Sequence, residues 1–219
     1  MDTSKSLTFP PLNSEADSEI ALLAAAWNCA VLSDDSDFFI FNVKGGYIRL
    51  SFLRLNYSRF TAKIYYRSKL ASHFRISPEL LPLFASLAKN DYVSAKALVD
   101  FKSALGRVRN DKRVGKRVTI AKIVGFLRGL PSLCSQEEAL KFTLELITSH
   151  QSRNTLQHVI ELSLQEYKIK ESNLLRNFEE GLIHSSLPTL HGKRVLFHFL
   201  KSNSDTTCFS LHLIRIHLM

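Results

Sequence analysis

Residues 14–37 read SEADSEIALLAAAWNCAVLSDDSD, and this stretch decides the fold that we expect. Ser14 is a good helix N-cap, and an acidic residue follows three positions later, where a capping box places one. Apolar residues then recur with helical spacing as far as Trp27, which predicts a helix. The apolar run at 29–32 has the length and composition of a buried strand. The stretch therefore predicts a helix that packs on a sheet and leads into a parallel strand.

Acidic side chains stand at the start of this helix and at the end of this strand. Glu15 and Asp17 lie at the predicted helix start, and Asp34, Asp35 and Asp37 follow the predicted strand. A helix that runs back along the sheet would bring both groups to the carboxyl edge, where parallel strands carry functional groups. Crowded carboxylates repel one another, so several at one edge indicate a divalent metal site. Oxygen ligands without nearby His or Cys favour Mg²⁺ or Mn²⁺.

The same acids also have a purely structural interpretation. Glu15 and Asp17 would complement the positive end of the helix dipole. The acids at 34–37 would form the turn that follows the strand. Spacing alone leaves both interpretations open.

Three short motifs occur in order in the first half of the chain: EAD at 15–17, VLSDDSDF at 31–38 and LLPLFASLAKNDYV at 80–93. Together they resemble the internal region of the flap endonuclease/XPG superfamily, and within it the asteroid homologue branch. Three ordered motifs are more specific than any one of them. The resemblance implies a PIN-like α/β nuclease domain in which acidic side chains hold two metal ions. Carried over, the metal ligands are Glu15, Asp17, Asp35, Asp37 and Asp91, and Asp35 and Asp37 are the catalytic residues.

The resemblance implies a structure-specific endonuclease that cuts single-stranded or overhang-bearing DNA by two-metal phosphodiester hydrolysis with Mg²⁺ or Mn²⁺. It further implies DNA repair in the nucleus. An alternative from another class is a non-catalytic adaptor of the epidermal growth factor receptor pathway, which contacts a protein partner through the helical half. The superfamily has a glycine-led first strand with further acids before the EAD motif. The given sequence does not contain that segment, so we expect a fragment, an incomplete gene model or a shortened paralogue, and weak or no cleavage by the chain as given.

The third motif follows a helix that we predict over 80–88. Ser77 and Pro78 give this helix a strong start. The superfamily usually has glycine where Lys89 stands. Asp91 has a structural alternative as the N-cap of a further helix predicted over 95–105.

Basic residues are densest between positions 107 and 122. Three interpretations stay open: a surface that tracks phosphates, a nuclear localisation signal, or a solvated loop and helix start. A net charge of +9 favours a polyanionic partner. The candidates for nucleic-acid binding are Arg107, Arg109, Lys112, Arg113, Lys116 and Arg117.

We therefore expect an α/β fold, with a partial PIN-like parallel sheet and helices, followed by an all-helical C-terminal extension. Apolar residues at 38–41 and alternation at 47–52 predict a hairpin. A short strand or helix is expected at 193–200. The predicted parts are a flexible leader (1–13), the C-terminal part of the nuclease domain (14–105), a helical extension with the basic cluster (106–190) and an irregular tail (191–219).

Cysteine usage and hydropathy limit the location. Cys29, Cys134 and Cys208 are scattered, so neither a disulfide framework nor a zinc module is indicated, and a reducing compartment is expected. The sequence has no signal peptide and no apolar run of membrane-spanning length. His212 and His217 do not share a helical face, so we assign no metal to them. We expect an intracellular protein that is not secreted and has no membrane partner.

Overall fold

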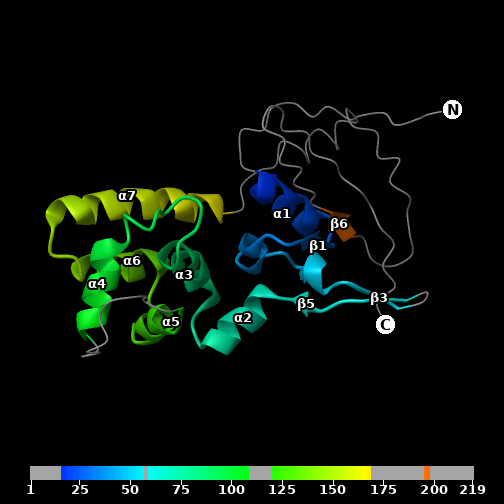
Figure 1. Cartoon of the computed structure of the whole chain (residues 1–219), viewed down its shortest axis with the longest axis horizontal. Coiled ribbons are helices and arrows are strands. Elements are labelled where there is room, and N and C mark those ends of the chain that lie inside the picture. The colour runs from blue at the N-terminus through cyan, green and yellow to red at the C-terminus, as the bar shows by residue number, and fades with distance from the viewer. Residues whose placement is uncertain (1–15, 57–58, 109–119, 169–194, 198–219) are drawn as a thin grey trace. The chain divides into compact units, whose positions relative to one another are not determined.

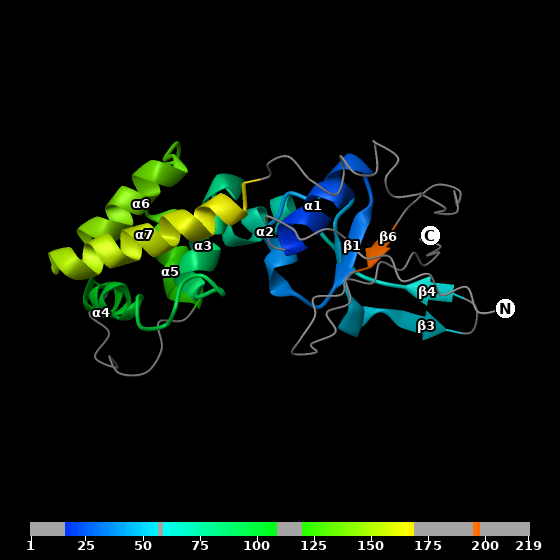
Figure 2. The same cartoon turned by 90° about the horizontal axis from the view of Figure 1, so that it is seen from above.

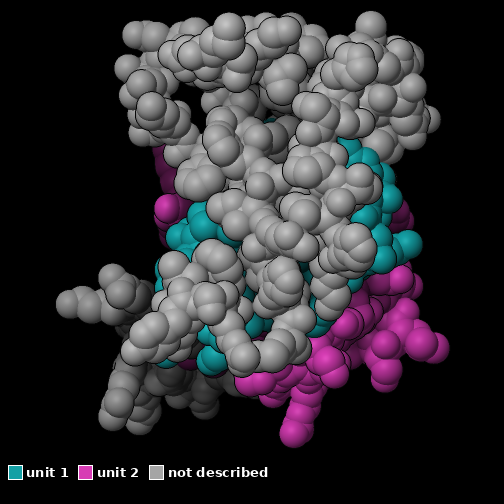
Figure 3. All heavy atoms as spheres, turned by 90° about the vertical axis from the view of Figure 1, so that its right-hand side faces the viewer, with its two compact units in different colours: residues 1–67, 169–219 teal, residues 68–168 magenta. Residues whose placement is uncertain are grey.

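The computed structural model describes residues 16–56, 59–108, 120–168 and 195–197 (Figure 1). Two units make up the chain, and Figure 3 colours them separately. Unit 1 comprises residues 1–67 and 169–219, and unit 2 comprises residues 68–168. All strands of the described residues belong to unit 1. The predicted α/β class is confirmed, whereas the predicted domain boundaries stay predictions.

Unit 1 is built on a four-stranded sheet with the order β5-β2-β1-β6. The inner strand β1 (Ala30–Ser33) pairs in parallel with β2 (Tyr47–Arg49) and with β6 (Val195–Phe197). On the other side of β2, β5 (Ile64–Tyr65) pairs antiparallel. The expected parallel sheet is thus a small mixed sheet. The strand or helix expected at 193–200 is a strand where the structure describes it.

The helix before β1 was predicted correctly. It is α1 (Ala16–Ala26), which packs against β1 and β6 (Figure 1). The side chain of Leu23 is fully buried, and every residue of β1 is buried. A strand with a parallel neighbour on each side and a helix on its face is buried on both faces, which explains the apolar run before Ser33. Asn28, in the turn between helix and strand, has a φ of 48°, which asparagine tolerates.

The predicted hairpin over 38–52 is wrong. Residues Ser36–Phe39 form a 3-10 helix, η1, and β2 pairs with β1 in parallel. The ring of Phe38 is buried, and its centroid lies 5.8 Å from the ring centroids of both Phe41 and Tyr47. The apolar residues at 38–41 therefore fill the core as a helical turn, because burial of these rings outweighs strand pairing.

An antiparallel pair of strands follows the sheet. After β2 comes the 3-10 helix η2 (Leu50–Phe52), and then β3 (Arg54–Asn56) pairs with β4 (Arg59–Thr61). On one face of the main sheet, Ala30, Leu32 and Ile48 pack together. These side chains form a small apolar cluster on that face of the sheet.

Unit 2 is organised around one helix. All seven residues from Leu81 to Leu87 are buried, as expected for a helix that is apolar on every side. This helix, α3, contacts α5 and α7, and α6 also contacts α7 (Figure 2). The helices here are α2 (Arg67–Phe74), α3 (Leu81–Ala88) after η3 (Pro78–Leu80), α4 (Val99–Val108), α5 (Ile120–Arg128), α6 (Gln136–Glu145) and α7 (His150–Glu166).

The caps of these helices follow the sequence signals closely. The Ser77 hydroxyl accepts the N–H of Glu79, and Ser135 forms a reciprocal capping box with Glu138. The helix predicted over 95–105 begins only at Val99.

In the part of the chain that the structure describes, no helix combines the length and the apolar character needed to cross a membrane. Cys134 is a buried thiol rather than a half-cystine.

Gly45 offers a test of the packing around β1. A Cβ built on Gly45 would lie 2.1 Å from the carbonyl carbon of Cys29, so the loop approaches the entry of β1 more closely than any side chain permits. We expect Gly45→Ala to lower the free energy of unfolding by on the order of 3 kcal/mol. Urea unfolding followed by circular dichroism measures this loss.

The matched control is Gly129→Ala in unit 2. There the new Cβ would lie 3.3 Å from the carbonyl oxygen of Phe126, a tight contact that small shifts relieve. We expect a change much smaller than that of Gly45→Ala. Equal losses for the two variants would contradict the close approach of Gly45 to β1.

Candidate active site

Asp35 begins the turn at the carboxyl end of β1. Its Oδ1 accepts the backbone N–H of Asp37 at 3.0 Å and thereby caps η1. The hydroxyl of Ser33 accepts the N–H of Asp35 at 3.0 Å, which tightens the turn. The structural interpretation of Asp35 is thus realised. The cap engages Oδ1 only, so it is compatible with a metal ligand role for Oδ2.

Asp34 contacts Arg49 of β2 and Ser51 of η2. Its Oδ1 accepts the backbone N–H of Ser51 at 3.0 Å and lies 3.6 Å from the Nε of Arg49. The hydrogen bond from Ser51 is the main cause that lowers the pKa of Asp34, and the charge of Arg49 adds to it. Asp34 therefore fastens η2 to residues 34–37, which we call the acidic turn.

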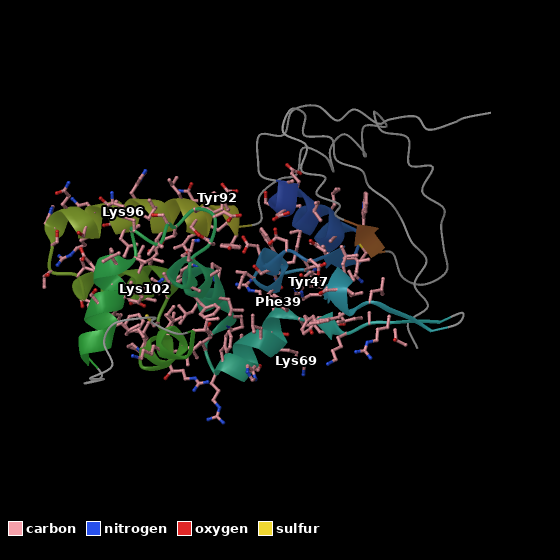
Figure 4. All side chains as sticks on the ribbon, in the orientation of Figure 1. Phe39, Tyr47, Lys69, Tyr92, Lys96 and Lys102 are labelled. Carbon is pink, nitrogen blue, oxygen red and sulfur yellow. The ribbon has the colours of Figure 1, made fainter. Side chains whose placement is uncertain are left out.

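Tyr47 lies on β2 beside this turn. Its ring is in edge contact with Phe39 at 4.8 Å between centroids (Figure 4). The side chain is 1% exposed, and its hydroxyl has no hydrogen-bond partner among the described residues. Burial is the main cause that raises the pKa of Tyr47 above its usual range, and the charges of Asp34 and Asp35 add to it. Tyr47 is thus a neutral donor beside the acids.

Of the other ligands predicted in unit 1, the structure describes Asp17 but not Glu15. Asp17 lies half-buried in the first turn of α1, and α1 contacts η1. Glu15 lies outside the described residues. Among residues 16–56, 59–108, 120–168 and 195–197, no three His, Cys, Asp or Glu side chains form a group that could hold a metal ion. The five-residue ligand set therefore stays a prediction.

Asp91 belongs to unit 2 and follows α3. Lys89 before it has a φ of 88° in the left-handed half of the map, which favours glycine. The Oδ1 of Asn90 accepts the N–H of Val93 at 3.0 Å and shapes the turn. Because α4 begins only at Val99, the alternative in which Asp91 caps the next helix is wrong.

A buried polar network holds the turn that carries Asp91. The amide nitrogen of Asn90 donates to the hydroxyl oxygen of Ser163 at 2.7 Å and to that of Tyr167 at 3.3 Å. The hydroxyls of Ser163 and Ser86 lie 2.8 Å apart, and both side chains are fully buried. Because buried polar groups are costly unless paired, this network fixes the turn against α7.

The basic cluster lies almost wholly outside the described residues. Arg107 belongs to the last turn of α4, and the candidates from Arg109 to Arg117 are outside the described ranges. The three interpretations of this cluster stay predictions.

The donor set agrees with a hard divalent cation. Asp35 and Asp37 offer carboxylate oxygens at the carboxyl end of a parallel strand, which is the chemistry that Mg²⁺ and Mn²⁺ prefer. Asp34 is engaged by Arg49 and Ser51. Within the described residues, the acidic turn thus supplies a pair of candidate ligands, and it agrees with the metal in chemistry.

Sequence reasoning did not single out several of these residues. The alternation at 47–52 predicts a strand through Arg49 and Ser51, yet the parallel register places Arg49 opposite Ser33 and so beside the acidic turn. The network of Asn90 with Ser163 joins distant segments. Spacing gives no signal for such a contact.

An α/β unit with paired carboxylates after an inner parallel strand is consistent with a partial domain of the XPG-like class. A family model described as "XPG domain containing" matches residues 11–209. The chain therefore belongs to the XPG-domain-containing family, in its asteroid branch.

Relatives in several animals support this assignment. The single-strand DNA endonuclease ASTE1 of Homo sapiens is 32% identical over 177 residues, which cover 77% of this chain and 26% of that protein. The Danio rerio protein of the same name is 29% identical over 176 residues, or 75% of this chain and 24% of that protein. Protein asteroid of Drosophila melanogaster is 30% identical over 166 residues, or 48% and 19%.

The chain spans about a quarter of the length of the ASTE1 relatives that it matches. No solved structure matches it significantly.

The lowered pKa of Asp34 predicts a pH dependence. Because the folded-state pKa is below the ordinary value of about 3.9, the contribution of Asp34 to stability is present above that value and is lost as pH falls through the folded-state pKa. Asp34→Asn keeps an acceptor for Ser51 but has no charge. We expect it to be less stable than the parent chain near neutral pH and equally stable in strong acid.

Urea midpoints measured at several pH values test this expectation. A stability difference that stays constant throughout the acid range would show that the charge of Asp34 plays no part.

The backbone of Lys89 predicts a stabilising substitution. Relief of a strained φ is worth about 1–3 kcal/mol, and the extra freedom of glycine in the unfolded chain offsets up to about 1 kcal/mol. We therefore expect Lys89→Gly to raise the free energy of unfolding by about 1 kcal/mol. Asn28→Gly is the control, since asparagine already tolerates its conformation. A destabilised Lys89→Gly variant would contradict the strain.

Proposed function

We propose that this chain contributes to a metal-dependent endonuclease that cuts single-stranded or overhang-bearing DNA by two-metal phosphodiester hydrolysis. The proposal rests on the pair Asp35 and Asp37 at the carboxyl end of buried β1, read together with the printed name of the ASTE1 relatives. Asp37 and the Oδ2 of Asp35 would hold one divalent ion. By resemblance alone, Glu15, Asp17 and Asp91 complete the set.

The bound ions would supply activation of water and stabilisation of the leaving oxygen. The residues of this chain would hold these ions in position. The cap from Asp35 to Asp37 holds the acidic turn in one shape, and Ser51 and Arg49 engage the Oδ1 of a third carboxylate, that of Asp34. The turn is thus preorganised before any ion binds.

The basic residues between 107 and 122 would then attract the phosphate backbone. DNA repair and nuclear localisation belong to the proposal as well. The same basic cluster is a candidate nuclear localisation signal.

A non-catalytic adaptor of epidermal growth factor receptor signalling is the second candidate. The observation in its favour is that unit 2 exposes large apolar side chains, which are common in protein-binding surfaces. They are Val99, Ile120, Leu133, Phe142 and Leu162.

Metal binding separates the two candidates. We expect the doubly substituted Asp35→Ala, Asp37→Ala chain to bind Mn²⁺ at least about 10-fold more weakly than the parent chain, because both carboxylates of the turn are lost. Titration calorimetry or the electron paramagnetic resonance of free Mn²⁺ measures the affinity. Cleavage of a labelled single-stranded oligonucleotide with Mg²⁺ is the second readout.

Glu145→Gln is the control, since this exposed acid ends α6 in unit 2. It should bind Mn²⁺ like the parent chain. If the double substitution leaves Mn²⁺ affinity unchanged, the assigned ligands are wrong, and an adaptor role becomes the better proposal.

A further inference from the structure

The segment that follows β2 lies beside the acidic turn. In the parallel register, Arg49 is the partner of Ser33, the last residue of β1. The strands therefore end together, and η2 leaves the sheet where the acidic turn begins. Whatever η2 presents to solvent is presented at the carboxyl edge of the sheet.

Asp34 fixes η2 in this place through two contacts. One is the 3.0 Å hydrogen bond from the N–H of Ser51, and the other is the 3.6 Å ion pair with Arg49. A segment held at two points loses little freedom when it binds a ligand, so binding to it is preorganised.

Phe52 is the aromatic side chain that η2 exposes. It is 44% exposed, and the guanidinium carbon of Arg49 lies 5.0 Å from its ring centroid. Such a distance is typical of a cation stacked on an aromatic ring. Arg49 and Phe52 thus place a cation beside an exposed ring. Proteins that bind single-stranded nucleic acids use such cations for the phosphate and such rings for the base.

Two polar atoms on this face of β2 have no partner within hydrogen-bond distance among the described residues. Tyr47 and Arg49 are two residues apart, so they lie on the same face of the strand. The two atoms are the buried hydroxyl of Tyr47 and the buried Nε of Arg49, and the latter lies 3.6 Å from the Oδ1 of Asp34. A buried donor without an acceptor costs about 1–3 kcal/mol, and a phosphate oxygen or an ordered water that accompanies it would supply one.

We infer that Arg49 and Phe52 form a binding site for one nucleotide of single-stranded DNA, with the phosphate on Arg49 and the base stacked on Phe52. Asp34 is the positioning residue that holds this site beside Asp35 and Asp37. The inference deepens the proposed function, since it names how the strand is held at the metal-binding edge. Nothing in this contact needs a metal ion.

Binding is measured by the fluorescence anisotropy of a labelled oligothymidylate in excess EDTA, so that no cleavage occurs. Phe52→Leu removes the ring and keeps an apolar side chain, and we expect on the order of 10-fold weaker binding because base stacking is lost. Phe52→Tyr should bind like the parent chain. Binding to duplex DNA should not change, because its bases are not available for stacking.

Arg49→Gln separates the phosphate contact from the stacking contact. Loss of one phosphate contact should lower the slope of log affinity against log salt by about 0.7, whereas Phe52→Leu should leave that slope unchanged. Asp34→Asn should weaken binding, although it removes a negative charge, since η2 is no longer held by an ion pair. If Asp34→Asn strengthens binding, the positioning role is wrong.

Phe142→Leu is the matched control, because Phe142 is an aromatic residue of unit 2 with 39% exposure. If Phe142→Leu weakens binding as much as Phe52→Leu, or if Phe52→Leu binds like the parent chain, the nucleotide site is wrong. The latter result would be expected if a protein segment covers Phe52 instead.

These outcomes are independent of the proposed cleavage. Weakened DNA binding in Phe52→Leu together with unchanged Mn²⁺ affinity in the Asp35, Asp37 double variant supports the nucleotide site and overturns the metal site. The opposite pair of results overturns the nucleotide site alone.

Discussion

The parallel pairing of β1 with β2 and β6 is the constraint on which unit 1 depends. It buries β1 on both sides and requires a run of apolar residues, and α1 covers the same strand. Because parallel strands end at one edge, the pairing also decides what surrounds the acidic turn. Asp34, Asp35 and Arg49 are neighbours for this reason. A one-residue slip of β2 would remove Arg49 and Tyr47 from the face they share with the turn.

The acids after β1 differ in role because each has a different partner. Asp35 caps η1 through one oxygen, whereas Asp34 is engaged by Ser51 and Arg49. This division reconciles the structural interpretation of the acidic turn with the chemical one. A carboxylate that caps a turn is held in place by that cap, and it still has an oxygen to offer. The contact between Asp34 and Arg49 in turn supplies a cation beside the acids, where an anionic substrate would otherwise be repelled.

Local signals in the sequence predicted the elements that local physics controls. The helix over 16–26, the buried strand after it and the caps Ser77 and Ser135 are set by spacing and by hydrogen bonds within a few residues. The hairpin was wrong because the rings at 38–41 pack against Tyr47, which pairing rules do not reveal. Arg49, Phe52 and Asn90 were missed since their partners lie on other segments. The family resemblance located Asp35, Asp37 and Asp91, but it carries no information on Asp34 as the residue that holds η2.

We propose that a divalent ion binds at the carboxyl end of β1. Paramagnetic broadening by Mn²⁺ in nuclear magnetic resonance spectra tests this most directly, because amide signals close to the ion disappear at low Mn²⁺ concentration. The expectation is that the amides of Ser33, Asp35 and Asp37 broaden first as Mn²⁺ is added. Broadening confined to other acidic positions, with the signals after β1 unchanged, would contradict it.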